Sequence, residues 1–573
     1  MKDIWNLPNI VHLKVSEEKG RCIIANRDIK AGEVIWLEYP FIYIVFEEFL
    51  DSVCDTCLKY IGTEKVVNII VCNGCSVVKY CSNICKSNSE GIHKFECKLM
   101  KNKFKDISEK CGVTFDRVRI LSRFIIVNLF SKSNFGIFSN IKHENKLLYS
   151  SYEHVKTLVS HISEFCQERK SIYLSLASEL LNIFENSQYH KTFGSDHHEI
   201  GASSISLSIM DLVEILCIID SNSFGIPIFA SSYYSYYYDN ILKNSNSSFE
   251  NPSNSLQLSS ILLSPNITAW GLFPYASLIN HSCEPNCSYL GNDESTRYPY
   301  IEIRSTTNIP KGDEITISYI ELYESRKQRI SQLYKTKYFI CRCTRCKQDL
   351  YKSMDYFIEG ILCYNCAKLK NQKVLLKCIS SNFYDILKNQ DHNQCISILE
   401  QESDLISIIA AQYKCTNCQL IYNGSEIANI IKNIEDIIDE SSLLNNEHGD
   451  VHRAIELLRS ALDNYLLKNT QIHYLHYLIY RCCKLLGFWS VIIKEWGYVE
   501  HYIGQMIKCN IAIFKNKNNL DISNLYAARA IALENLGSIS EAQKSWNSCL
   551  AIREICCGCE HSLYRFVAKR LHN

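Results

Sequence analysis

Residues 277–287 read Ser-Leu-Ile-Asn-His-Ser-Cys-Glu-Pro-Asn-Cys, and residues 312–319 read Gly-Asp-Glu-Ile-Thr-Ile-Ser-Tyr. By chemistry alone, the Asn280–His281 pair could ligate a metal or form a hydrogen-bonded polar pair in a core, and the second role is the commoner one. A cysteine-rich segment, Cys341-Arg-Cys-Thr-Arg-Cys346, follows closely. Cysteines at this spacing are typical of zinc ligands, so the two segments have to be interpreted together with the metal sites.

The composition limits the classes of protein to which the chain can belong. The 573 residues contain 61 basic and 61 acidic side chains, so nucleic acid is not expected as the main ligand. The most apolar run, residues 210–219, is short and interrupted by Asp211 and Glu214, so we expect no membrane span. The 29 cysteines follow no secretory leader, which favours zinc binding inside the cell, in the cytoplasm or nucleus, over disulfides.

Eight regularly spaced ligands, enough for two tetrahedral zinc ions, lie between residues 54 and 97. Their spacing resembles that of a MYND zinc finger. The resemblance implies that one ion is bound by Cys54, Cys57, Cys81 and Cys85, and the other by Cys72, Cys75, His93 and Cys97. It also implies that the finger binds short, proline-containing peptides and has no catalytic role.

The combination of these segments is similar to the SET-and-MYND (SMYD) family of protein-lysine methyltransferases, over essentially the whole chain. The resemblance implies an α+β protein: a split SET β-fold with an inserted MYND zinc finger, a helical SET insert, a zinc-binding post-SET segment and a helical TPR-like C-terminal domain. We expect the following bounds: 1–50 for the N-terminal part of SET, 51–100 for the finger, 101–220 for the helical insert, 221–322 for the C-terminal SET core with a low-complexity insertion at 231–264, 323–350 for post-SET, 351–424 for a zinc ribbon and 425–573 for the TPR-like domain.

The same resemblance implies a methyl donor, S-adenosylmethionine, and a catalytic residue, Tyr319, that orients the lysine amine. The implied donor-binding residues are Lys19, Gly20, Arg21, Tyr149, Asn222, Ser277, Asn280, His281, Tyr319 and Phe339. A third zinc ion would be bound by Cys283, Cys341, Cys343 and Cys346. Because the donor's sulfonium already activates the methyl group, the enzyme needs only to align a neutral lysine amine, and an apolar channel disfavours the ammonium form.

Three positions depart from the family pattern. Cys22 stands where a glycine is usual, and a polar position of the family falls on Thr157, which weakens that part of the match. Lys337 falls where a tyrosine lines the lysine channel, and the adjacent Tyr338 is the expected channel residue. These departures favour an alternative, a non-catalytic adaptor whose finger and helices bind peptide partners while the SET portion is a scaffold. The intact Asn-His pair and Tyr319 favour the enzyme.

A fourth cysteine set and a helical repeat occupy the C-terminal half. The four cysteines form the ligand pattern of a zinc ribbon, with an inserted helical segment at 380–400, or else two unrelated turns: Cys363, Cys366, Cys415 and Cys418. The repeat consists of small and apolar residues at matching spacings, typical of TPR-like helix pairs or of a generic helical bundle: Gly449, Ala454 and Leu462, then Gly537, Ala542 and Leu550.

The sequence therefore predicts a protein-lysine N-methyltransferase that uses S-adenosylmethionine, binds three structural zinc ions and a fourth at the zinc ribbon, and acts as a monomer on a protein or peptide with a target lysine. The sequence identifies neither the substrate, whether a histone or another protein, nor the number of methyl groups transferred.

Overall fold

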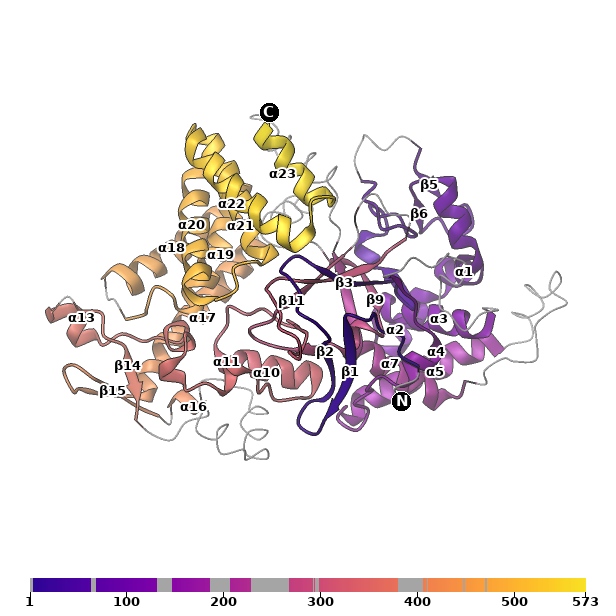
Figure 1. The fold of residues 1–573 in the computed structure, drawn as a ribbon, viewed down its shortest axis with the longest axis horizontal. Helices are drawn as coiled ribbons and strands as arrows, with labels where there is room; N and C mark the ends of the chain where they lie inside the picture. Colours follow the sequence, from indigo (N-terminus) through magenta and orange to yellow (C-terminus); the bar gives the residue numbers. More distant parts are fainter. Residues whose placement is uncertain are drawn as a thin grey trace.

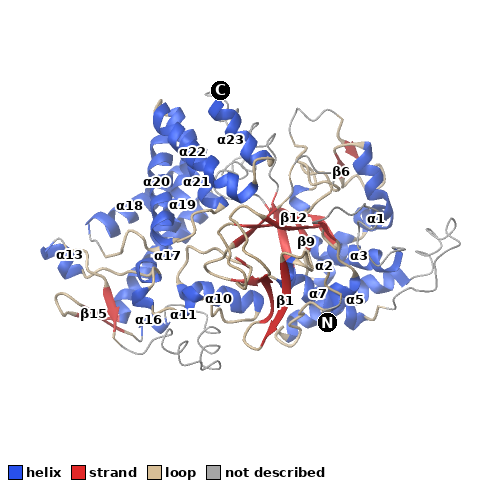
Figure 2. Ribbon diagram, in the orientation of Figure 1, coloured by secondary structure: helices blue, strands red, loops and turns tan. Residues whose placement is uncertain are grey.

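The computed structural model describes residues 4–62, 68–130, 147–185, 207–227, 267–291, 293, 298–370, 372–379, 406–409, 411–446, 449–468 and 471–572. The predicted low-complexity insertion at 231–264 and the predicted helical segment at 380–400 lie outside these residues. Short strands form the centre of the molecule, with one group of helices from the first half of the chain on one side and the C-terminal helices on the other (Figures 1 and 2).

The central strands join two parts of the chain that lie far apart in the sequence. The pairs are antiparallel, and each unites a strand of the first 50 residues with one beyond residue 266: β3 (Val34–Glu38) with β12 (Ile301–Ser305), and β4 (Ile42–Val45) with β9 (Ile267–Leu272). The side chains of Ile35 and Trp36 are fully buried, as are those of Ile42 and Ile44. The core therefore forms only when both parts come together, as a split β-fold requires.

Further strands complete this core. They are β1 (Val11–Ser16) and β2 (Gly20–Ala25), which form a hairpin; β7 (Leu147–Leu148), parallel to β3; β8 (Ser223–Pro227), antiparallel to β9; β11 (Cys287–Leu290), antiparallel to β12; and β10 (Asn280–His281), parallel to β13 (Thr316–Ile317). Strands β2, β3 and β4 are rich in isoleucine and valine, which favour extended backbone.

The finger and the helical insert pack against one edge of this core (Figure 1). They comprise β5 (Ile70–Val71), β6 (Lys79–Tyr80), α1 (Asn83–Asn102), α2 (Phe104–Cys111), α3 (Phe115–Phe130), α4 (Tyr152–Lys156), α5 (Gln167–Glu185) and α7 (Ile209–Asn222). One face of α3 is apolar and fully buried, with no exposure of Val118, Leu121, Phe124 or Ile125.

Two arginines of α3 form ion pairs that join the finger to the helical insert. Arg119 and Arg123 both pair with Asp55, at 2.7 Å, and with Glu96, at 3.0 Å. All four side chains are buried, and each charge faces a partner of opposite sign. Since Asp55 lies between two zinc-ligand cysteines and Glu96 precedes another, the ion-pair network fixes the finger's orientation.

The post-SET and zinc-ribbon segments consist of short elements: α10 (Arg326–Lys337), α11 (Thr344–Lys347), α12 (Asp355–Ile358), α13 (Tyr364–Lys370), α16 (Ile406–Ile409) and an antiparallel sheet of β14 (Leu376–Cys378), β15 (Gln412–Cys415) and β16 (Ile421–Asn423). The C-terminal helices are α17 (Gly424–Asn446), α18 (Val451–Leu462), α19 (Tyr477–Ile492), α20 (Trp496–Ile513), α21 (Leu520–Asn535), α22 (Ile539–Cys557) and α23 (Ser562–His572).

The two halves of the predicted repeat have equivalent places in these helices. Gly449 precedes α18 with φ 66°, and Gly537 precedes α22 with φ 75°, a conformation that glycine adopts without strain. Ala454 and Ala542 are both buried, one turn into their helices. Small residues there let neighbouring helices approach closely, as TPR-like packing requires. None of the helices within the described residues is both long enough and apolar enough to cross a membrane.

Candidate active site

Asn280 and Glu314 hold together the two segments that opened the sequence analysis. The side-chain amide of Asn280 donates hydrogen bonds to the backbone oxygen of Arg21, at 2.8 Å, and to the Glu314 carboxylate, at 2.9 Å. The same carboxylate pairs with Lys19 at 2.6 Å. The parallel pairing of β10 with β13 brings Asn280 beside Glu314, so the loop containing Gly20 is fixed against the Asn-His segment. Glu314 was not among the predicted site residues.

His281 and Tyr319 form the next contact. The backbone N–H of Tyr319 donates to Nδ1 of His281 at 3.1 Å, and the Tyr319 hydroxyl donates to the backbone oxygen of Ile279. Burial raises the pKa of the Tyr319 hydroxyl above its ordinary value, so Tyr319 is a neutral hydrogen-bond donor. The Phe339 ring lies 6.3 Å from His281 and 6.5 Å from Tyr319, between ring centroids.

Asn222 and Ser277 meet on another wall of the site. The Ser277 hydroxyl donates to the backbone oxygen of Asn222 at 3.0 Å, and the Asn222 amide donates to the backbone oxygen of Val159 at 2.9 Å. Among the described residues, the buried hydroxyls of Ser221 and Ser223 have no hydrogen-bond partner. Buried polar groups without a partner are rare in folded proteins, and a bound polar molecule such as S-adenosylmethionine would supply their partners.

Three predicted residues have surroundings that the sequence did not indicate. The Tyr149 ring packs against Tyr39, with 5.4 Å between centroids. Tyr338 adopts φ 58° at the end of α10, and its ring lies against His161, at 5.2 Å, in the helical insert. Lys337 lies beside the predicted catalytic residue, with Nζ 5.8 Å from the centroid of the Tyr319 ring.

The other departures from the family pattern fit into the same site. The Cys22 side chain is buried, with Sγ 3.4 Å from the Asn280 amide nitrogen. Thr157 contributes its backbone oxygen, which accepts a hydrogen bond from the Arg21 guanidinium at 2.8 Å. Since a backbone group serves there, the contact with Arg21 does not depend on the side chain at position 157.

Four sets of predicted zinc ligands come together, each with its ligand atoms within 4.8 Å of one another. The sets are Cys54, Cys57, Cys81 and Cys85; Cys72, Cys75, His93 and Cys97; Cys283, Cys341, Cys343 and Cys346; and Cys363, Cys366, Cys415 and Cys418. Sulfur atoms that share a tetrahedral zinc ion lie about 3.8 Å apart, whereas a disulfide requires about 2 Å. The Sγ separations of 3.5–4.0 Å, as in Cys57–Cys81 and Cys283–Cys341, fit zinc.

The finger has the interleaved arrangement that the resemblance implies, and the fourth set lies at the β14–β15–β16 sheet, as expected of a zinc ribbon. With four protein ligands each, the clusters leave no open position for a substrate. They therefore fit structural zinc ions.

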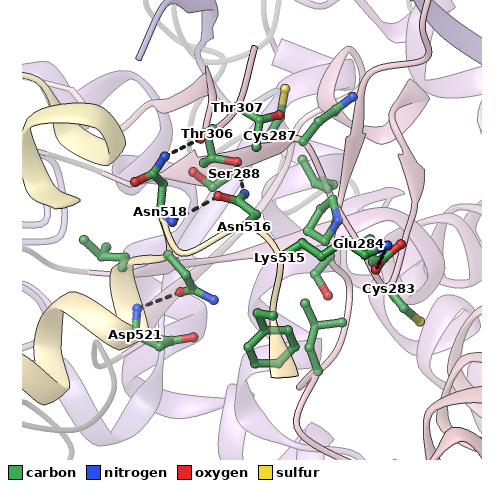
Figure 3. A pocket seen from close by; sticks show the side chains of 18 of the residues that line it. Cys283, Glu284, Cys287, Ser288, Thr306, Thr307, Lys515, Asn516, Asn518 and Asp521 are labelled. Atoms are coloured by element: carbon green, nitrogen blue, oxygen red, sulfur yellow. Dashed lines mark hydrogen bonds and ion pairs between the residues drawn. The ribbon is translucent and has the colours of Figure 1, made fainter. Parts of the chain in front are cut away.

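A cleft with a volume of about 790 Å³ lies between the β core and the C-terminal helices (Figure 3). One wall includes Glu284, Ser288 and Ser318, and the other includes the segment 513–521, which connects α20 to α21. Asn516 and Asn518 join the walls by donating to the hydroxyl and backbone oxygen of Thr306, both at 2.8 Å. The cleft reaches Ser318, the residue that precedes Tyr319 in the chain, although Tyr319 itself is not among its lining residues.

Comparison with known proteins agrees with this architecture. The SET domain family model matches residues 20–320, more than half of the chain. Histone-lysine N-methyltransferase ASHR1 of Arabidopsis thaliana is 27% identical over 63% of this chain and 60% of its own length. Histone-lysine N-methyltransferase SMYD3 of Homo sapiens is 27% identical over 58% of this chain and 60% of its own.

A SET and MYND domain-containing protein of Dictyostelium discoideum is 24% identical over 60% of this chain and 61% of its own length. The chain thus spans about 60% of the length of these relatives. The matched residues 20–320 include the Gly20 loop, the Asn-His segment and Tyr319. The chain belongs to the SET domain family, among the members that combine this domain with a MYND finger.

Proposed function

We propose that the protein transfers methyl groups from S-adenosylmethionine to lysine side chains of other proteins. The observation that carries the proposal is the convergence of Asn280, His281 and Tyr319 with the Gly20 loop, linked through Glu314. The names of the relatives, which are histone-lysine methyltransferases, support the same chemistry.

In this proposal each predicted residue has a definite role. The backbone of Lys19, Gly20 and Arg21, the side chains of Asn222 and Asn280 and the backbone of His281 hold the donor, with Ser277 orienting Asn222; Tyr149 and Phe339 flank it. When bound, the donor supplies an activated methyl group. The Tyr319 hydroxyl orients the lysine amine, and the buried surroundings of the Tyr319 ring disfavour its ammonium form. Tyr338, the predicted channel residue, packs toward His161, and Lys337 lies beside Tyr319 instead.

The cleft beside Ser318 is the proposed route for the substrate peptide. It is concave, and it reaches Ser318, the residue next to the proposed catalytic Tyr319 in the chain; we take both properties as support for a peptide site. Its walls belong to two lobes, so their shapes would restrict which lysines enter. We further propose that the finger binds proline-containing peptides, that the chain acts as a monomer, and that it works in the cytoplasm or nucleus, where thiols remain reduced for zinc.

Labelled methyl transfer tests the proposal. Zinc-loaded protein, incubated with S-adenosylmethionine carrying a radioactive methyl group and a cell extract, should produce methyllysine, detected after acid hydrolysis. Tyr319→Phe should lower the rate by roughly a hundredfold, because the amine loses its orientation. The control is Tyr356→Phe, which also removes a hydroxyl bonded to a backbone oxygen, that of Leu376, but far from the site. Equal rates in both variants would contradict the role of Tyr319.

A further inference from the structure

Lys337 brings its amine into the proposed site, between Ser221 and the Tyr319 ring. It is the last residue of α10, and its Nζ donates a hydrogen bond to the backbone oxygen of Ser221 at 2.7 Å. Ser221 immediately precedes Asn222, a proposed donor-binding residue, and the same Nζ lies 5.8 Å from the centroid of the Tyr319 ring. The amine is thus placed between the donor-binding wall and the catalytic tyrosine.

The left-handed backbone of Tyr338 explains how the chain achieves this placement. Helix α10 ends at Lys337, and φ 58° at Tyr338 turns the chain so that the Tyr338 ring packs toward His161 while Phe339 lies toward His281. Lys337 remains on the side of Tyr319, half-buried. An aromatic side chain at this position would line the site, whereas the lysine brings a nucleophilic atom into it.

The electrostatic surroundings of Lys337 differ from those of Lys19, the other lysine of the site. Lys19 forms an ion pair with Glu314 at 2.6 Å, which raises the pKa of its ammonium group. Within the described part of the chain, Lys337 forms no ion pair. The acid that opposes its deprotonation, Asp220, is already paired with Arg117 and Arg169, and burial lowers the pKa of Lys337. Lys337 is therefore the lysine of this site that is suited to react as a neutral amine.

We propose that Lys337 is itself a methyl acceptor, so that the chain methylates its own Lys337 when S-adenosylmethionine is bound. The inference rests on the proposed function. In the step, the lone pair of Nζ forms a bond to the methyl carbon while the carbon–sulfur bond breaks. The bonding pair stays on sulfur, which gives S-adenosylhomocysteine, and the methylated ammonium group releases a proton to solvent. The hydrogen bond to Ser221 engages one N–H and leaves the lone pair available.

Mass spectrometry of the full-length, zinc-loaded chain tests this directly. After incubation with S-adenosylmethionine that carries a deuterated methyl group, digestion should yield the label on Lys337 and none on Lys335, which is exposed on the same helix. The first-order rate should not change when the protein is diluted, because donor and acceptor belong to one chain. Lys337→Arg should abolish the label on this peptide, and calorimetry of the variant with S-adenosylhomocysteine measures its cofactor binding separately.

A second measurement needs no turnover. S-adenosylhomocysteine carries no transferable methyl group, and at saturation it should protect Lys337, but not Lys335, from an amine-modifying reagent. If other proteins become methylated while Lys337 stays unlabelled and unprotected, Lys337 only caps the end of α7, and the inference is overturned while the proposed function stands. If the donor does not bind at all, both are overturned.

Discussion

The buried carboxylate of Asp355 offers the sharpest test of how the post-SET segment is held together. Asp355 pairs with Arg326 at 3.0 Å, Arg329 at 2.8 Å and Arg345 at 2.6 Å, and none of the four side chains is more than 6% exposed. These guanidinium groups hold the pKa of the carboxyl well below its usual range. Arg345 also donates to the backbone oxygen of Cys283, a ligand of the third zinc cluster, at 3.4 Å.

The charges explain why three arginines can share one acid. A zinc ion with four thiolate ligands carries a net charge of about −2, which offsets the net charge of +2 on three guanidinium groups and one carboxylate. The cluster and the zinc site should therefore be stable only together. Replacing the acid alone leaves the arginines buried without their anion.

We expect Asp355→Asn to destabilise this segment by about 3–5 kcal/mol. Each carboxylate oxygen accepts at least two charged hydrogen bonds, so whichever oxygen becomes the amide nitrogen, at least two bonds are lost, at about 1.5–3 kcal/mol each. The assay is zinc release against denaturant, followed with a metallochromic chelator. The control, Glu18→Gln, removes the acid of an exposed pair with Lys347 and should change nothing measurable.

A wild-type release curve for Asp355→Asn would refute this reasoning, because it would show that the buried arginines do not need the acid. A shift equal to that of Glu18→Gln would have the same meaning. Release of one zinc ion ahead of the others at low denaturant would support it.

Three further predictions concern other parts of the structure. Gly74→Ala should weaken zinc binding at the finger site that contains Cys97, because a Cβ at position 74 would lie 2.6 Å from the Cys97 sulfur. Gly91→Ala, in open space on α1, should leave zinc binding unchanged, and zinc titration distinguishes the two variants. Cys415→Ser should lower the zinc content from four ions to three by metal analysis, while Cys378→Ser, in the same sheet, should leave it unchanged. Burial raises the pKa of Glu38 to about 8, against about 4.3 in an unfolded chain. The contribution of Glu38 to stability is therefore fully present below pH about 4 and is lost as the pH rises to about 8. Glu38→Gln should remove this part of the pH dependence of the free energy of unfolding.

The spacing of the cysteines identified candidate zinc ligands, because ligands often occur in pairs close in sequence. The grouping of the finger ligands and the set that contains Cys283 came from the family resemblance. Cys363 and Cys415, although far apart along the chain, each begin a Cys-x2-Cys pair, and the structure brings them together. The helices of the C-terminal half could also be predicted from the sequence, because apolar periodicity and the glycines before α18 and α22 are local signals.

The active site was predicted only through the family resemblance, and its supporting contacts were missed. Lys19 and Glu314 are separated by 295 positions in the sequence, and no local pattern identifies such a pair. The orientation of Lys337 toward Tyr319 depends on the left-handed backbone at Tyr338, which is unusual for a bulky residue. Both features depend on tertiary packing, which periodicity and spacing do not encode.

Calorimetric titration of the zinc-loaded protein with S-adenosylmethionine tests the central claim most directly. The account predicts saturable binding with one donor per chain, weakened by about tenfold or more in Asn280→Ala, which loses the hydrogen bonds to Arg21 and Glu314. Absence of binding in protein whose zinc clusters are filled would contradict the assignment of this site to methyl transfer.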